Sequence, residues 1–179
     1  MERLDPWRRE ALELPRQRFI GVHPTPVLVL RWVVEGDLGQ SAGPQSTHLH
    51  NVGDGLKERI AASSIVPDRR PIARERIISI KVRPNEGRHQ FTVGRRPTAD
   101  LFVNDYTVSV QHGVLHWVPR IKRWMFQDQG STNGTWINGT KIPVRQRALL
   151  RSCDELQLGR MVFLFLEPYD LHRYLVGDY

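Results

Sequence analysis

The chain has 179 residues, of which 40% are apolar and 25% are charged, a composition typical of globular proteins that bury a core. No apolar run approaches the ~20 residues that a membrane helix needs, and the first residues lack the apolar core of a signal peptide. With Cys153 as its single cysteine the chain can form no internal disulfide, so a reducing cytoplasm is the expected location.

The net charge of +7 lies almost entirely in residues 76–179. A basic domain can bind nucleic acid, and it can equally capture phosphorylated or acidic peptides. The arginines stand singly or in pairs, and aromatic residues do not alternate with them as in many single-strand binders. Nucleic acid is therefore the less favoured partner of the two.

Residues 1–71 are expected to form an extension with short helices and one strand. Pro6 suits a first helical turn capped by Asp5, and apolar residues then recur at helical spacing up to Pro15. The run VLVLRWVV at 27–34 predicts a buried strand, which should pair with an edge of a sheet because a lone strand is unstable. Residues 36–55 are rich in Gly, Ser and Pro and indicate a linker or mobile loop.

Three further expectations concern the extension. Residues 56–63 predict a short helix. His48 and His50 are read as loop histidines, since a metal site would need more ligands at suitable spacing. Thr25 and Thr47 look exposed, and if phosphorylated either could dock into a binding pocket of the same protein.

Residues 72–166 predict an all-β domain, a two-sheet antiparallel β-sandwich, because short strands follow one another at turn-rich spacing. The expected strands cover residues 77–83, 90–93, 101–103, 113–118, 124–127, 135–137, 155–158 and 161–166. Residues 167–179 form the expected C-terminal tail, in which Pro168 could start a helical turn that packs on the domain.

The most informative stretch is GSTNGTWING, residues 130–139, which contains two Asn-Gly pairs. A type I′ turn needs positive φ at both of its central positions. Asn and Gly tolerate positive φ, so the Asn-Gly pair favours this turn. The two turns should flank a short strand at 135–137. Ser131, Thr132 and Asn133 would then lie on a sharply bent loop, either as ordinary turn residues or as donors directed at an oxyanion.

Several motifs in a fixed order resemble the forkhead-associated (FHA) domain, a β-sandwich of the FHA/SMAD-like type that binds phosphothreonine peptides. The order is Gly94-Arg95, Asp100 with Asp105, Ser109 with His112, the run Asp128–Thr135, Asn138-Gly139, and finally the segment DELQLG at 154–159. The resemblance covers residues 77–166, about half of the chain, and its stand-alone arrangement is similar to that of bacterial signalling proteins. It implies phosphothreonine recognition downstream of a Ser/Thr kinase, with no cofactor or metal.

Arg95 is the first candidate for the phosphate, because a dianion favours charge-assisted donors on a rigid support. Gly94 before it permits close approach of the backbone. From spacing alone Arg95 could equally pair with Asp100 or Asp105 as an ordinary surface arginine. The resemblance favours the phosphate, because the Arg of the Gly-Arg pair holds it in that family.

The resemblance assigns further contacts to two loops. It implies that Ser109 contacts the phosphate, that Thr132 contacts the phosphothreonine and that Asn133 holds the peptide backbone next to it. Additional candidates for the phosphopeptide site are Arg96, Gln111 and Ser131. Gly134 and Asn138 are expected to be structural turn residues.

His112 is expected to be architectural, buried beneath the binding loop and hydrogen-bonded to the backbone, as the resemblance implies. A catalytic reading with Ser109 is rejected, because the two residues on one loop have neither a nucleophile elbow nor an orienting partner. No residue is therefore assigned a catalytic role.

Two positions depart from the family pattern. Val110 stands where a polar residue usually follows the binding serine, which removes one donor and could leave the pocket dependent on Arg96 or Gln111. Cys153 stands where the family commonly has Gly, and it is expected only to adjust a turn.

Two alternatives to phosphothreonine recognition remain open. The first is a phosphate-independent interaction scaffold with a degenerate pocket, suggested by Val110. The second is a basic nucleic-acid-binding protein, which would show steep salt dependence. An enzyme is not expected, and neither is a membrane partner.

Overall fold

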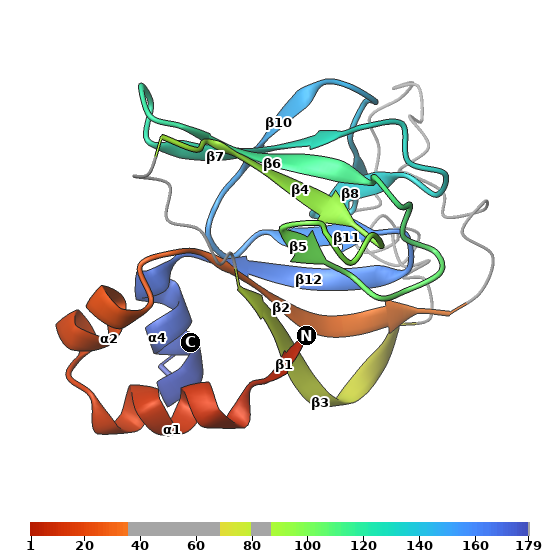
Figure 1. Ribbon diagram of the computed structural model, residues 1–179. Helices are drawn as coiled ribbons and strands as arrows, with labels where there is room; N and C mark the ends of the chain where they lie inside the picture. The colour runs from red at the N-terminus through yellow and green to blue at the C-terminus, as the bar shows by residue number, and fades with distance from the viewer. Residues whose placement is uncertain (36–68, 80–86, 179) are drawn as a thin grey trace, which may run out of the picture.

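The computed structural model describes residues 1–35, 69–79 and 87–178. Two sheets stack face to face, with a group of helices outside one of them (Figure 1). The seven-stranded sheet runs in the order β1 (Glu2–Arg3), β3 (Arg69–Ser79), β2 (Val27–Val34), β12 (Met161–Leu166), β11 (Glu155–Leu158), β8 (Thr135–Ile137) and β9 (Thr140–Lys141). The five-stranded sheet runs in the order β10 (Arg147–Leu150), β7 (Arg123–Asp128), β6 (Gly113–Val118), β4 (Gln90–Gly94) and β5 (Leu101–Phe102).

The predicted two-sheet sandwich is confirmed. Its paired strands are antiparallel except for β4 and β5, which run parallel and join at Val93 and Leu101. Residues buried between the sheets form the main core, in which Phe91 and Phe126 of the small sheet face Leu158 and Phe163 of the large one. Burial of these large side chains supplies the main driving force for holding the two sheets together.

The large sheet is covered on both faces, which explains why its central strands read as continuous apolar runs. Along β12, Phe163 and Phe165 belong to the sandwich core, whereas Leu164 and Leu166 belong to a second apolar cluster beneath the helices. Successive side chains of a strand point to opposite faces, so both faces of this strand are dry.

The strand β2 lies inside the large sheet, between β3 and β12, and not at an edge as expected from the sequence. Leu28 and Leu30 enter the sandwich core, and Val27 and Val29 enter the cluster beneath the helices. The strand β3 also begins earlier than predicted, at Arg69, so the predicted boundary between residues 71 and 72 falls within a strand. The domain boundaries themselves stay a prediction.

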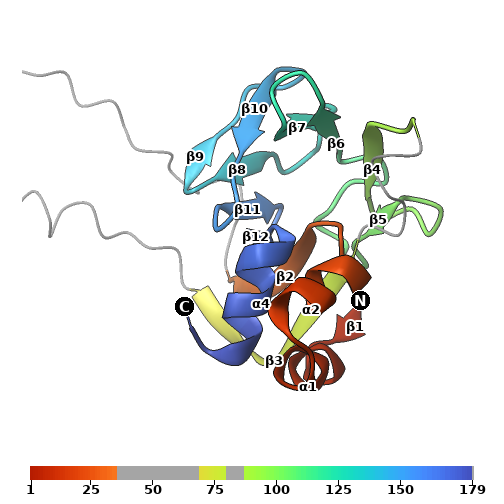
Figure 2. The same ribbon diagram turned by 90° about the vertical axis from the view of Figure 1, so that its left-hand side faces the viewer.

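Three helices pack on the outer face of the large sheet, α1 (Asp5–Glu13), α2 (Arg16–Val22) and α4 (Pro168–Val176), as Figure 2 shows. The predicted first helix is confirmed, but Asp5 is its first residue, and Leu4 occupies the cap position without a side-chain cap bond. The helix α2 was not predicted, because its sequence RQRFIGV carries only a weak apolar pattern.

The C-terminal helix α4 confirms the expected helical turn after Pro168. It buries Leu171 and Leu175 against the sheet and ends at Gly177 in the left-handed conformation. His172 is also buried and stacks edge-on against Phe19 of α2, with no hydrogen-bond partner for its ring nitrogens among the described residues.

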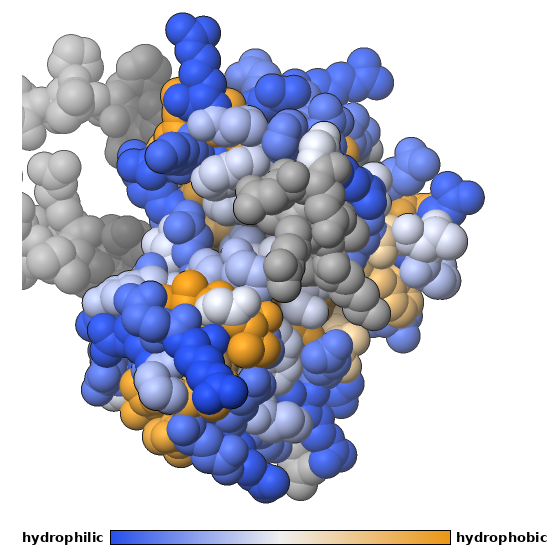
Figure 3. Space-filling view, turned by 60° about the vertical axis from the view of Figure 1, so that its left-hand side comes forward, coloured by the Kyte–Doolittle hydropathy of each residue, from blue (hydrophilic) through white to orange (hydrophobic). Residues whose placement is uncertain are grey.

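The exposed side of this helical layer is largely hydrophilic, with apolar residues gathered in limited patches (Figure 3). Leu12, Val22 and Tyr169 are its large apolar residues that remain at least half exposed. No helix among residues 1–35, 69–79 and 87–178 is long and apolar enough to cross a membrane.

Thr25 was expected to be exposed, but it is only 9% exposed where the chain enters β2. A buried threonine is poorly accessible to a kinase. The burial of Thr25 therefore argues against its phosphorylation and docking into the binding site. The expected linker at 36–55, the helix at 56–63, His48, His50 and Thr47 lie outside the described residues.

Candidate functional site

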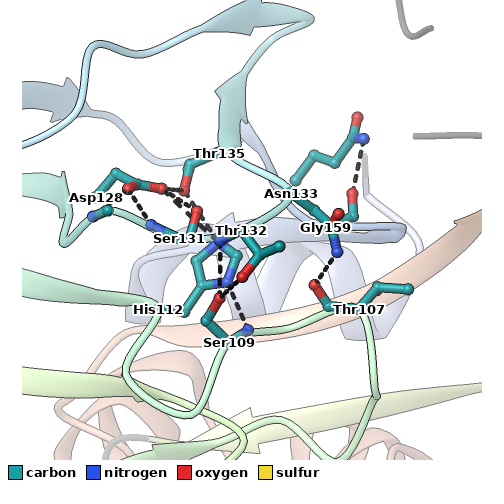
Figure 4. Close-up of polar contacts among 11 residues, drawn as sticks. Thr107, Ser109, His112, Asp128, Ser131, Thr132, Asn133, Thr135 and Gly159 are labelled. Carbon is teal, nitrogen blue, oxygen red and sulfur yellow. Dashed lines mark hydrogen bonds and ion pairs between the residues drawn. The ribbon is translucent and has the colours of Figure 1, made fainter. Parts of the chain in front are cut away.

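Loops from both sheets meet at one end of the sandwich. The segment 103–112 follows β5, the segment 129–134 joins β7 to β8, and the tight turn at 159–160 joins β11 to β12. Figure 4 shows the side chains of these loops converging on one small region. The two loops that sequence analysis singled out are thus neighbours in space, although 23 positions separate Ser109 from Thr132.

Ser109 and Thr132 are held together by two contacts. The backbone N–H of Thr132 donates to Ser109 Oγ at 3.0 Å, and the two hydroxyl oxygens lie 3.4 Å apart (Figure 4). Thr132 is exposed and Ser109 is half-buried, so both residues reach the surface of the protein. The predicted pair of hydroxyl donors is therefore brought together.

His112 lies directly beneath these hydroxyls and is fully buried. Its Nδ1 accepts the backbone N–H of Ser109 at 3.2 Å, so the ring proton belongs on Nε2 and is donated to Thr135 Oγ1 at 3.1 Å. Burial lowers the pKa of His112, although the nearby negative charge of Asp128 opposes that change. A neutral histidine thus fixes the conformation of the loop that carries Ser109.

Asp128 is a supporting residue, which the sequence analysis quoted as the start of a motif but to which it gave no role. Its carboxylate is buried and accepts the backbone N–H groups of Gly130 and Ser131, the Ser131 hydroxyl at 2.5 Å and the Thr135 hydroxyl at 2.6 Å. Burial raises its pKa, but the hydrogen bonds from Ser131 and Thr135 outweigh burial and leave the pKa below the usual value. The sequence signal for this role was an Asp directly before a polar turn, because such a side chain can accept the backbone N–H groups of the turn.

Ser131 supports the loop, and its predicted contact with the phosphopeptide stays a prediction. Its hydroxyl points inward and donates to Asp128, away from Ser109 and Thr132 (Figure 4). The hydroxyl proton is thus already used, which makes Ser131 a support of the loop.

Arg95 begins the loop after β4 and contacts the segment that carries Ser109. Its backbone N–H donates to the carbonyl of Ser109 at 2.9 Å, and its Nε donates to the carbonyl of Val108 at 3.3 Å. A Cβ on Gly94 would lie 2.3 Å from the carbonyl oxygen of Val110, so only glycine permits this close approach. The guanidinium is thereby anchored by one nitrogen to the segment that carries Ser109.

The two carboxylates considered as partners of Arg95 are taken by other arginines. Asp100 pairs with Arg88 at 2.5 Å, and Asp105 pairs with Arg160 at 2.7 Å. Arg95 is exposed and forms no ion pair with the described residues. An arginine without an ion pair, anchored on the segment that carries Ser109, fits an anion site better than an ordinary surface arginine.

Asn133 and Gly134 do not form the predicted type I′ turn, because only Gly134 has positive φ, at 82°. The Asn133 side chain instead donates through Nδ2 to the carbonyl of Thr107 at 2.8 Å, which ties the two loops together. The loop is further held by the backbone N–H of Gly159, which donates to the carbonyl of Gly134 at 3.3 Å.

The second Asn-Gly pair forms the predicted hairpin turn. Asn138 and Gly139 have φ of 50° and 77°, and they connect β8 to β9. The Asn138 side chain also donates to Asp154 and accepts the backbone N–H of Glu155, both at 2.8 Å. Asn138 therefore has a structural role away from the hydroxyl pair.

The remaining candidates lie on the rim. Arg96 and Gln111 are exposed, and the side chains of the described residues offer them no hydrogen bond. Val110 is 49% exposed next to Ser109, so the position that lacks the usual donor presents an apolar surface. Cys153 is exposed, with φ of 74°, in the turn before Asp154.

Comparison with known proteins finds one matching family model, the FHA domain, over residues 91–159. The chain is 35% identical over 115 residues to an oxoglutarate dehydrogenase inhibitor of Corynebacterium diphtheriae, covering 60% of this chain and 76% of that protein. It is 39% identical over 77 residues to the glycogen accumulation regulator GarA of Mycolicibacterium smegmatis, covering 42% of this chain and 44% of the relative.

Similar solved structures include the FhaA FHA domain complexed with the intracellular domain of Rv3910, at 24% identity and a TM-score of 0.41. That match covers 50% of this chain and 87% of the other. The N-terminal FHA domain of S. cerevisiae Rad53p in complex with a phosphothreonine peptide matches at 22% identity and a TM-score of 0.46, covering 55% and 90%.

Proposed function

This chain belongs to the FHA-domain family, and on that premise we propose that it binds phosphothreonine on a partner protein as a non-catalytic adaptor in Ser/Thr-kinase signalling. The observation that carries the proposal is the meeting of Ser109 and Thr132 above the buried ring of His112, with Arg95 anchored on the carbonyls of Val108 and Ser109. These donors come from three separate loops and are positioned by backbone bonds, as an anion site requires.

Each residue takes a specific part in binding. The hydroxyls of Ser109 and Thr132 exchange their mutual contact for phosphate oxygens, and the backbone N–H of Thr132 adds a third donor. Arg95 keeps its Nε on the carbonyl of Val108 and directs its terminal nitrogens to the phosphate. Asn133, whose Nδ2 is bound to Thr107, offers its Oδ1 to a backbone N–H of the peptide.

The geometry also supports a non-catalytic role. A serine nucleophile needs a base that accepts its hydroxyl proton. His112 instead accepts the backbone N–H of Ser109, and its other nitrogen faces Thr135. The histidine is thus occupied in support of the loop.

The names of the relatives suggest the first partners to test. One is named an inhibitor of oxoglutarate dehydrogenase and another a regulator of glycogen accumulation. We therefore propose a cytoplasmic adaptor whose partner is a metabolic enzyme or a Ser/Thr kinase that carries a phosphothreonine.

The test is an array of degenerate phosphothreonine peptides, with phosphoserine and unphosphorylated arrays as controls, probed with the full chain and with Arg95→Ala. We expect phosphothreonine-selective binding that the substitution abolishes. Equal binding to all three arrays would favour the phosphate-independent scaffold. Steeply salt-dependent binding to nucleic acid without any peptide binding would favour the nucleic-acid alternative.

A further inference from the structure

Two large side chains stand exposed on the loop that carries Ser109. Tyr106 is 76% exposed and Val110 is 49% exposed, one on each side of the serine along the chain. Exposed apolar groups close to a polar binding site commonly contact the ligand, because their burial on binding is favourable. Both belong to the segment that carries Ser109, and Thr107 of this segment is bonded to Asn133, so a peptide bound at Ser109 and Asn133 would lie close to it.

The ring of Tyr106 is held in place by Arg160. The guanidinium carbon of Arg160 lies 4.5 Å from the ring centroid, and Nη1 lies 3.4 Å from the tyrosine hydroxyl. Arg160 itself is fixed, because its Nε and Nη2 donate to Asp105 Oδ2 at 3.0 and 2.7 Å. Asp105 is 8% exposed, so the cation rests on a buried carboxylate.

The same unit is connected to the peptide-binding residue Asn133 through Thr107. The Thr107 carbonyl accepts Asn133 Nδ2, and its hydroxyl accepts the backbone N–H of Arg160 at 3.1 Å. The Thr107 hydroxyl also donates to Asp105 at 2.6 Å. Tyr106 is therefore a rigidly supported side chain next to a predicted ligand residue.

The charges around Tyr106 define what it can accept. The guanidinium of Arg160 lies over one face of the Tyr106 ring, and its positive charge offsets the negative potential of the ring. The other face is therefore a poor site for a second cation. Arg95, whose Nε is bound to the Val108 carbonyl, adds a second positive charge to this loop. A lysine or arginine of the peptide would be repelled here, whereas an apolar or aromatic side chain would gain contact area.

We infer that this protein selects phosphothreonine segments with a bulky apolar or aromatic residue, and no lysine or arginine, where the peptide passes over Tyr106. Tyr106 makes the contact, and Arg160 is the residue that positions it. The inference rests on the proposed function, since it concerns the sequence around the phosphothreonine that the pocket reads.

The experiment measures dissociation constants for sets of three phosphothreonine peptides. The three peptides of a set differ at one position only, and there is one set for each position around the phosphothreonine. At the varied position the three peptides carry Phe, Ala and Lys. The proteins are the full chain, Tyr106→Ala, Arg160→Lys and the control Ile121→Ala. Ile121 is 52% exposed but lies in the β6–β7 turn, at the opposite end of β7 from the Asp128–Thr135 loop.

At one position the full chain should bind the Phe peptide about tenfold more tightly than the Ala peptide, and the Lys peptide more weakly than both. Tyr106→Ala should remove most of that preference, Arg160→Lys should reduce it, and Ile121→Ala should preserve it. An unchanged preference in Tyr106→Ala would overturn the inference while leaving the proposed function intact. Failure of the full chain to bind any phosphothreonine peptide would overturn both.

Discussion

The buried ring of His112 accepts the backbone N–H of Ser109 through Nδ1, at a distance of 3.2 Å. The same ring reaches Thr135 on β8 through Nε2. One neutral imidazole therefore connects the loop after β5 to the strand that follows the Asp128–Ser131 turn. The position of the Ser109 hydroxyl depends on a residue that no ligand would touch.

Replacing the ring of His112 should show how far binding depends on a residue that supports the Ser109 loop without contacting the ligand. His112→Phe keeps the ring volume but leaves the N–H of Ser109 and the hydroxyl of Thr135 without the imidazole. We expect a loss of about 2–4 kcal/mol in the free energy of unfolding, because buried polar groups lose their partner. Urea denaturation measures it.

The affinity of folded His112→Phe for a phosphothreonine peptide should also fall, because Ser109 is no longer held. The matched control is His116→Phe, since His116 is also buried, at 4% exposed, but bonds Gln127 in the sheet. Unchanged affinity in His112→Phe would show that the ring does not position the pocket.

Stability should decline in two stages as pH falls. Burial lowers the pKa of His112 and, with the charge of Arg147, that of His116, from an ordinary value of 6.5. Below that value the unfolded chain binds protons that the folded chain does not, so stability falls with pH until the folded pKa is passed. Thermal unfolding between pH 8 and pH 5 should show this first decline, reduced in His112→Phe.

The second stage comes from carboxylates. Hydrogen bonds outweigh burial and hold the pKa of Asp105 and Asp128 below the ordinary 3.8. The stabilisation from these groups is therefore complete above 3.8 and is lost as pH falls through their lower folded values. A melting temperature that stayed constant from pH 5 to pH 2 would contradict this assignment.

Gly94 should tolerate no side chain. In Gly94→Ala the new Cβ would meet the carbonyl of Val110 at 2.3 Å and push the Ser109 loop outward. We expect destabilisation by about 1–3 kcal/mol and weaker phosphopeptide binding. Gly21→Ala is the control, because α2 leaves open space there and the helix should gain about 0.5–1 kcal/mol. Equal effects of the two substitutions would refute the close approach at Gly94.

Asn138 combines a backbone and a side-chain role, which two substitutions can separate. Asn138→Gly keeps the φ of 50° accessible but removes the bonds to Asp154 and Glu155. Asn138→Ala removes these bonds and also makes the positive φ unfavourable, so it should be about 1 kcal/mol less stable than the glycine variant. Chemical denaturation of the three proteins should give that order. Equal stability of the Gly and Ala variants would show that φ does not matter at this turn.

The sandwich could be predicted from the sequence because most of its strands are short and bounded by strong turn signals. The helical turn after Pro168 was predictable for the same kind of reason, from a proline start and apolar residues at helical spacing. The inner place of β2 was not predictable. Both faces of that strand are buried, so its sequence lacks the alternation that would identify its partners.

The chemistry of the site was only partly visible in the sequence. The meeting of Ser109 and Thr132 could be expected from the order of motifs, but the inward orientation of Ser131 depends on the buried carboxylate of Asp128. The contact between Tyr106 and Arg160 joins residues 54 positions apart, so no local pattern predicts it. Tertiary contacts decided these features.

The most direct test of phosphothreonine recognition is titration calorimetry with one peptide from the array, in phosphorylated and unphosphorylated form, against the full chain and Arg95→Ala. We expect phosphorylation to raise the affinity about 100-fold, as several charge-assisted bonds would, and Arg95→Ala to reduce it at least tenfold. Equal affinity of the folded full chain for the two peptides would contradict the account and return attention to the faces of the sheets.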